Sequence, residues 1–185
     1  MNKAIKQNGF TLLELTVSVS IIVLMTLVFL LNFRTADDSL KLRTAAETLI
    51  SDIRLAQNHS LGFLESVDDV ESLSGGWGVN FKKEDDFYTI FVDIDGDGFF
   101  DAGNDYEYYV GDLPKGVSIK SLQLVDSYGT ETDLNNLNLV FLPPLPTVLI
   151  NNVEDSSGRV ILENKSGLEM GAFFNFFGLI DIYEP

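Results

Sequence analysis

An almost uninterrupted apolar stretch, Phe10 to Phe33, lies near the start of the chain and carries a single charge, Glu14. In a helix rising about 1.5 Å per residue it reaches about 36 Å, which is enough to cross the core of a bilayer. Lys3 and Lys6 precede the stretch, so the positive-inside rule keeps the N-terminus cytoplasmic and places the rest of the chain across the membrane. We therefore expect a single-pass membrane helix over residues 10–33.

A secretory signal peptide and a generic signal anchor are the two ordinary explanations of this apolar stretch, and neither fits all of its residues. A secretory signal peptide has a shorter apolar region and a small-residue cleavage site, whereas here Arg34 and Thr35 follow. A generic signal anchor leaves Glu14 unexplained, because an unpaired carboxylate in the apolar slab costs several kcal/mol. The charge within the span therefore calls for a partner.

The helical pattern continues beyond the apolar stretch, since neither Gly nor Pro occurs from Phe10 to about Leu61. Over residues 34–62 the apolar positions fall on one stripe, and Gly62 suits a helix C-cap. The sequence thus predicts one helix of about 50 residues, apolar all round in its first half and one-faced in its second. The stripe comprises Leu42, Ala46, Leu49, Ile53, Ala56 and Ser60, broadened by Ala45 and Ile50.

After Gly62 the pattern changes to the alternation of strands, separated by turn residues, and Glu65–Ser74 is expected to be a polar loop. One long helix followed by short strands predicts an α+β fold, in which a long N-terminal helical spine packs against an antiparallel β-sheet in a globular domain over 63–185. The expected strands are Trp77–Phe81, Phe87–Val92, Glu107–Val110, Val117–Leu124, Leu137–Phe141, Thr147–Ile150, Arg159–Glu163, Met170–Phe176 and Leu179–Tyr183.

The composition limits the classes of function that the chain can have. The 185 residues include 12 Lys and Arg and 28 Asp and Glu, and the excess of acid falls in the β-rich part. An acidic surface argues against nucleic-acid binding, which needs clustered cations. No Cys occurs and His59 is the only His, so thiolate chemistry and multi-His zinc sites are excluded and no enzyme activity is expected.

The sharpest chemical motif runs from Asp93 to Asp101, DIDGDGFFD, with carboxylates at loop positions one, three, five and nine. This is the spacing of EF-hand-type calcium loops, in which alternate residues turn their oxygens toward one Ca²⁺. The expected ligands are Asp93, Asp95, Asp97, the Phe99 carbonyl and Asp101, and Asn104 or Asp105 could close the shell in place of the usual Glu. The alternative is a solvated acidic turn.

The residues Gly9-Phe10-Thr11-Leu12-Leu13-Glu14 resemble the class III signal of type IV pilins and type II secretion pseudopilins. The resemblance implies a leader over 1–9, cleavage between Gly9 and Phe10 by a prepilin peptidase, and N-methylation of Phe10 by the same enzyme. It also implies that Glu14 pairs with the N-terminal amine of a neighbouring subunit during assembly. The expected partners are other pilins or pseudopilins and an inner-membrane assembly platform.

Further segments resemble the GspH/FimT branch of minor pilins and pseudopilins: residues 42–62, Gly75 to Val79, Phe91 to Asp93, and Gly178 to Ile182. Residues Leu142–Asn152 depart from that pattern. The resemblance implies an inner-membrane subunit that enters a pseudopilus or pilus, with its globular domain periplasmic or extracellular. The alternative is a FimT-like component that binds extracellular DNA for uptake, which the acidic balance disfavours.

Overall fold

The computed structural model describes residues 10–62, 76–143 and 147–185, with the backbone alone described for 31–36. The predicted leader, residues 1–9, and the predicted loop Glu65–Ser74 lie outside the described residues. The chain divides between Asp37 and Asp38 into two compact units, which we take in turn.

Helix α1, Leu12–Ser60, belongs to both units and has 49 residues. It begins two residues later than predicted, because Thr11 acts as its N-cap: the Thr11 hydroxyl accepts a hydrogen bond from the Glu14 amide at 3.2 Å. At the other end Gly62 takes a φ of +71°, the left-handed conformation of a helix C-cap, as predicted.

In the first unit, the segment Leu12–Leu30 of α1 is long and apolar enough to cross a membrane, with a mean hydropathy of 2.4 and none of it buried. Its hydroxyl groups bond back to the helix itself; Ser18 and Ser20, for example, each donate to the carbonyl four residues earlier at 2.8 Å. These bonds hide polar groups that hydrocarbon could not satisfy. The segment thus suits an apolar surrounding.

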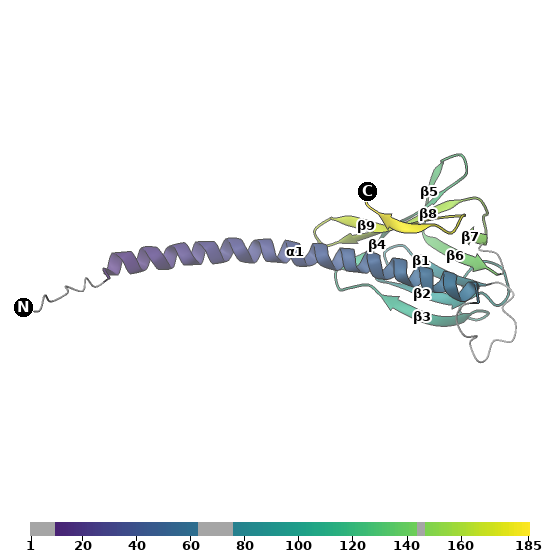
Figure 1. Ribbon diagram of the computed structural model, residues 1–185, viewed down its shortest axis with the longest axis horizontal. Helices are drawn as coiled ribbons and strands as arrows, with labels where there is room; N and C mark the ends of the chain where they lie inside the picture. Colours follow the sequence, from purple (N-terminus) through teal and green to yellow (C-terminus); the bar gives the residue numbers. More distant parts are fainter. Residues whose placement is uncertain (1–9, 63–75, 144–146) are drawn as a thin grey trace, which may run out of the picture. The chain divides into compact units, whose positions relative to one another are not determined.

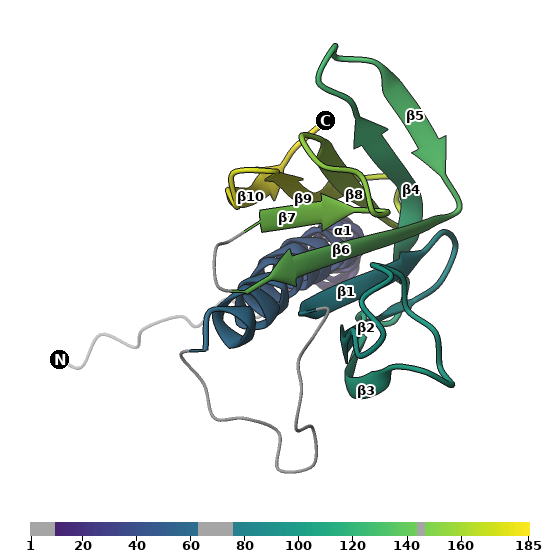
Figure 2. The ribbon, with the colours of Figure 1, turned by 90° about the vertical axis from the view of Figure 1, so that its right-hand side faces the viewer.

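In the second unit, the described residues form two antiparallel sheets of five strands each (Figures 1 and 2). The α+β class is confirmed, but two sheets stand where one was expected. Sheet A has the order β3-β2-β1-β6-β7 and sheet B the order β10-β9-β8-β4-β5. The strands are β1 Trp77–Lys82, β2 Phe87–Val92, β3 Tyr106–Asp112, β4 Val117–Val125, β5 Glu131–Leu134, β6 Asn136–Leu142, β7 Thr147–Ile150, β8 Ser157–Asn164, β9 Glu169–Asn175 and β10 Ile180–Tyr183.

The core of this unit lies where the second half of α1 meets both sheets, and Figure 2 shows the helix lying along them. Every residue of the predicted stripe is buried, including Ala46, Leu49, Ile53 and Ala56 at 0% exposure. The apolar residues of the stripe join one cluster with the inward side chains of both sheets, such as Phe81 and Phe174. Burying this stripe is what holds the helix to the domain.

Polar contacts fix α1 at defined points along its length. The Ser60 hydroxyl donates to the Phe141 carbonyl at 2.6 Å, and Gln57 donates to the Gly178 carbonyl at 3.0 Å. The buried Asn164 side chain donates to the Asp38 carbonyl at 3.1 Å. These bonds set the rotation and the height of the helix, which apolar packing alone leaves adjustable.

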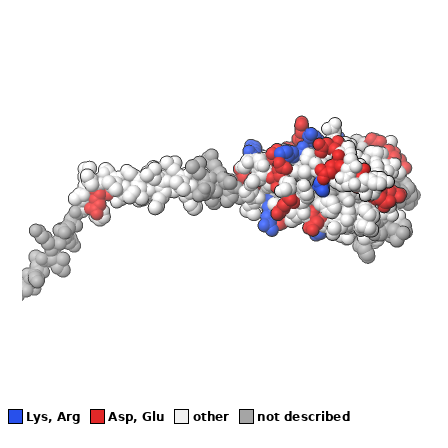
Figure 3. All heavy atoms as spheres, turned by 90° about the horizontal axis from the view of Figure 1, so that it is seen from above, with Lys and Arg blue, Asp and Glu red and all other residues white. Residues whose placement is uncertain are grey.

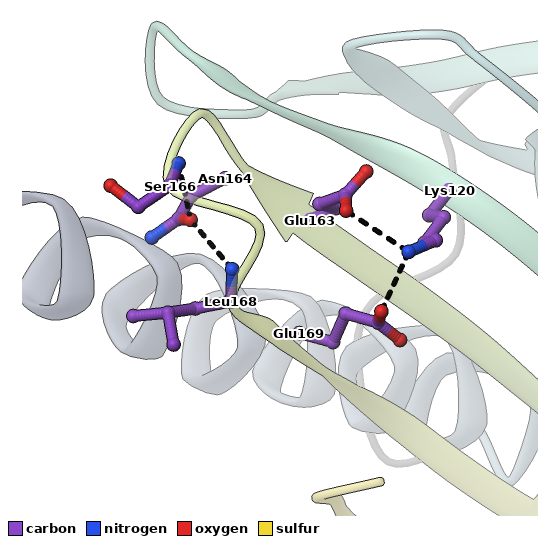
Figure 4. A network of polar contacts seen from close by, with 6 residues as sticks. All are labelled: Lys120, Glu163, Asn164, Ser166, Leu168 and Glu169. Carbon is purple, nitrogen blue, oxygen red and sulfur yellow. Dashed lines mark hydrogen bonds and ion pairs between the residues drawn. The ribbon is translucent and has the colours of Figure 1, made fainter.

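The turn between β8 and β9 is shaped by the same asparagine (Figure 4). Its side-chain oxygen accepts from the Ser166 and Leu168 amides, each at 3.0 Å. Nearby, Lys120 on β4 bridges Glu163 and Glu169 at 3.0 and 2.6 Å. Because Lys120 is exposed and both glutamates are only half-buried, we expect these ion pairs to add little stability and chiefly to align the strands.

Candidate functional site

The candidate metal centre is built on Asp93, the first residue after β2. Asp93 is 1% exposed, and its two carboxylate oxygens accept hydrogen bonds from the Gly96 amide at 2.8 Å and the Gly98 amide at 3.0 Å. Both glycines have a positive φ, +77° and +80°, which lets the chain fold back over the carboxylate. The local sequence therefore shapes the loop around one buried acid.

Three of the predicted ligands come together in this loop. Oxygens of Asp93, Asp95 and Asp97 lie within 4.8 Å of one another. Ligands held about 2.3–2.6 Å from a shared Ca²⁺ are separated by distances of this order. The Asp95 and Asp97 side chains are exposed, so a cation would reach the group from solvent.

The remaining predicted ligands are placed differently. Asp105 closes the loop, since its carboxylate accepts from the Ile94 amide at 3.0 Å and from the Asp101 amide at 2.8 Å. The side chains of Asp101 and Asn104 are exposed, and Asp101 is not part of the three-carboxylate group. The Phe99 amide donates to Asp97 at 2.8 Å.

Burial opposes the charged state of two acids in the loop, Asp93 and Asp105. Burial raises the pKa of Asp93, and the neighbouring carboxylates of Asp105 and Asp95 add to this, while the Gly96 and Gly98 amides work against it. Burial likewise raises the pKa of Asp105. A divalent cation would offset both the burial and the repulsion from neighbouring carboxylates, because opposite charge favours the ionised form. The donor set, oxygen only, fits a hard cation such as Ca²⁺.

A group of asparagines docks the loop against sheet A, and the motif gave no sign of it. The Phe100 amide donates to the Asn138 side-chain oxygen at 3.1 Å, and the same oxygen accepts from Asn80 at 2.7 Å. The backbone amide of Asn138 in turn donates to the side-chain oxygen of Asn151 at 2.7 Å. The only sequence signal was an unusual density of Asn within strands, where it is disfavoured.

The second candidate site is the start of α1. Phe10 is 77% exposed, and Glu14 is exposed one turn into the helix. No hydrogen bond or ion pair reaches the Glu14 carboxylate from any described residue. All other side chains from Leu12 to Leu30 are uncharged. Gly9 lies outside the described residues. A single carboxylate in an apolar surface is the group that a partner cation would meet.

The charge distribution separates the two parts of the chain (Figure 3). Residues Leu12–Leu30 are white apart from the acid near their start, while carboxylates, with Lys and Arg among them, are spread over the visible face of the domain. Such a domain attracts cations and repels polyanions.

His59 packs as an aromatic residue. Its ring stacks on Trp77 at 4.2 Å between centroids, and Tyr108 meets its edge at 5.3 Å. Burial lowers the pKa of His59, so the neutral ring is favoured. The structure thus gives His59 a packing role at the end of α1.

No protein-family model matches the chain, and neither a curated protein nor a solved structure shows significant similarity to it. The likeness to pilins therefore rests on the residues themselves, chiefly Gly9 to Glu14.

Proposed function

We propose that this protein is a structural subunit of the type IV pilin and type II secretion pseudopilin kind, a GspH/FimT-like minor pilin or pseudopilin. The observation that supports it most is Glu14: a carboxylate with no partner among the described residues, on an otherwise uncharged helical surface just after the Gly9-Phe10 signal. An anchor that only held the domain to the membrane would have no use for this charge.

Processing prepares the assembly site. A prepilin peptidase cuts between Gly9 and Phe10, which removes Lys3 and Lys6 and leaves Phe10 as the methylated first residue. The cut falls just before the Thr11 cap, so the mature chain enters α1 almost at once. Its new amine then stands within about a turn of its own Glu14.

Assembly pairs the amine of one subunit with Glu14 of another. In the bilayer each charge alone is costly, and pairing relieves both, so the pair favours the filament over the free subunit. Residues Leu12–Leu30 pack against the same segment of other subunits, while the acidic domain faces the periplasm or the exterior. Before assembly the subunit is a single-pass inner-membrane protein with a cytoplasmic N-terminus.

The experiment is to compare Glu14→Ala with Glu14→Asp in cells that hold the partner pilins and the assembly platform. Glu14→Ala should insert in the membrane as well as the wild type, because losing a charge favours insertion. It should be depleted from sheared filaments by about tenfold or more, whereas Glu14→Asp, which keeps the charge, should recover part of the incorporation. Normal incorporation of Glu14→Ala contradicts the assembly role.

We further propose that the Asp93 loop binds one structural Ca²⁺ through Asp93, Asp95 and Asp97. Extracellular calcium modules have Kd values of about 10⁻⁴–10⁻³ M. With free Ca²⁺ at about ten times Kd, binding adds about 1.4 kcal/mol to the stability of the domain. That corresponds to roughly 3–6 °C in Tm. The cation would rigidify the turn between β2 and β3.

Calorimetry of the full chain in detergent, first with chelator and then with millimolar Ca²⁺, tests this site. The wild type should gain stability, and Asp95→Ala should abolish the gain because it removes a carboxylate from the centre of the group. Asp133→Ala on β5 removes an exposed carboxylate elsewhere and should keep the gain. A wild-type Tm that does not move shows that the loop is a solvated turn, and leaves the assembly proposal untouched.

A further inference from the structure

Strand β3 is an unusual sheet edge. It has a single neighbour, β2, and no other described strand pairs with the backbone N–H and C=O groups on its other side. It has seven residues, whereas the other three edge strands of the described sheets, β5, β7 and β10, have four each. Long exposed edges invite pairing with another chain, and proteins usually protect them.

Two common protections of an edge strand are missing from β3. Neither Lys nor Pro occurs in it, and six of its seven residues are exposed. By contrast β7 is largely buried, and β10 is held beside α1 by the bond from Arg54 to the Ile180 carbonyl at 2.9 Å. A bulge in the pairing with β2 modifies the edge but does not cover it.

The two faces of β3 differ in chemistry. Directly opposed residues of paired strands share a face, so Tyr106 and Tyr109 lie on the side of Val92 and Ile90. Both tyrosines are more than 40% exposed. Glu107 and Asp112 lie on the opposite side of the strand, that of Phe91 and Phe87. The edge is thus aromatic on one face and acidic on the other.

The chain segment that contains β3 carries charge of one sign. Residues 87–112, which span β2, the aspartate loop and β3, contain seven carboxylates and no Lys or Arg. A second copy of this acidic chain would be repelled, while a cationic segment would be attracted and oriented.

We propose that β3 is a docking edge that accepts an extended basic segment of another protein as an added strand. In that segment apolar residues alternate with Lys or Arg, so that the apolar side chains meet Tyr106 and Tyr109 and the cations meet Glu107 and Asp112. Backbone pairing supplies the binding, and the two faces of β3 supply the register. The inference does not depend on the filament or on calcium.

The test uses a short fluorescent peptide of alternating Lys and Val and the full chain in neutral detergent at physiological salt. Two further peptides carry N-methyl groups on the backbone, one on the Lys residues and one on the Val residues. A strand added to β3 points only one of these two sets of amides at the edge. One methylated peptide should therefore lose binding by about tenfold or more and the other should bind like the parent. Equal binding of the two, or no binding of the parent peptide, overturns the proposal.

A matched pair of variants places the binding on β3. Val110→Lys and Thr147→Lys each add one positive charge at an exposed edge position, the first on β3 and the second on β7. Val110→Lys should weaken the parent peptide by about tenfold, and Thr147→Lys by less than about twofold. Equal effects would mean that the peptide senses only the overall charge, and would overturn the docking edge.

Discussion

The hydrogen bond between Tyr88 and Asp52 is expected to be a main tie between α1 and sheet A. Tyr88 on β2 is 2% exposed, and its hydroxyl donates to a carboxylate oxygen of Asp52 at 2.5 Å. Tyr88→Phe removes the donor and keeps the ring, so the packing of Phe81 against it is preserved. The substitution therefore isolates the hydrogen bond.

The size of the effect follows from the partner. Hydrogen bonds to charged groups contribute about 1.5–3 kcal/mol, and the half-buried Asp52 can recover some hydration once the hydroxyl is gone. We therefore expect Tyr88→Phe to lower the free energy of unfolding of the domain by about 1.5 kcal/mol. With a urea m-value of about 2 kcal/mol/M, the midpoint falls by about 0.7 M.

The pH dependence of the stability provides an independent test of the Tyr88–Asp52 hydrogen bond. Burial, and then the bond to Asp52, raise the pKa of Tyr88 above its usual value of about 10. The folded chain therefore keeps a proton that the unfolded chain loses, so stability falls as the pH rises above about 10. Tyr88→Phe should remove this part of the alkaline loss.

The assay is urea unfolding of the full chain in detergent, followed by the emission of Trp77, the only tryptophan. Tyr106→Phe is the control, because Tyr106 is 43% exposed on β3, and it should stay within about 0.5 kcal/mol of the wild type. In a double-mutant cycle with Asp52→Asn, the two substitutions should be coupled by about 1 kcal/mol. A Tyr88→Phe variant as stable as Tyr106→Phe would refute the reasoning.

Three other predictions concern His59, Gly171 and the acidic charge of the domain. Burial lowers the pKa of His59 below its usual 6.5, so the unfolded chain binds the proton more readily and stability should fall as the pH drops below about 6.5. In a series of urea melts at different pH, His59→Gln should reduce this acid-side loss of stability. At Gly171 an added Cβ would lie 1.8 Å from the Val160 carbonyl oxygen, so Gly171→Ala should lower the free energy of unfolding by about 3 kcal/mol in the same melts. The control is Gly129→Ala, which should cost about 1 kcal/mol, because a side chain is strained at its positive φ but has open space around it. Gel shifts at low salt should show no DNA binding, and a shift by the wild type would revive DNA uptake as a function.

Much of the fold could be predicted because its signals are local. The stripe from Leu42 to Ser60 follows the helical period, and all of it is buried. All nine expected strands agree with observed strands to within one or two residues at each end. The strand β5 was missed because its residues, Glu131 to Leu134, lack an apolar alternation; its exposed side chains carry no burial signal.

The rest depends on contacts between distant residues. The pairing of β1 with β6 joins Phe81 to Leu137, and no local pattern states that the strands divide into two sheets instead of one. The aspartate loop was predicted from its spacing, but its docking through Asn138 and the closure by Asp105 were not, since amide side chains in strands have no fixed partner. The hydrogen bond from Tyr88 to Asp52 likewise could not be predicted from the hydrophobic periodicity of the sequence.

The central claim is that the chain is processed and assembled as a pilin-like subunit, and the mass of its mature N-terminus tests this most directly. The protein should be extracted from membranes of cells with an active prepilin peptidase and its N-terminal peptide sequenced by mass spectrometry. We expect a chain that begins at Phe10 and carries one methyl group on its amine, with Lys3 and Lys6 gone. A chain that still begins at Met1, or one cut on the far side of the apolar segment after Phe33, would contradict it.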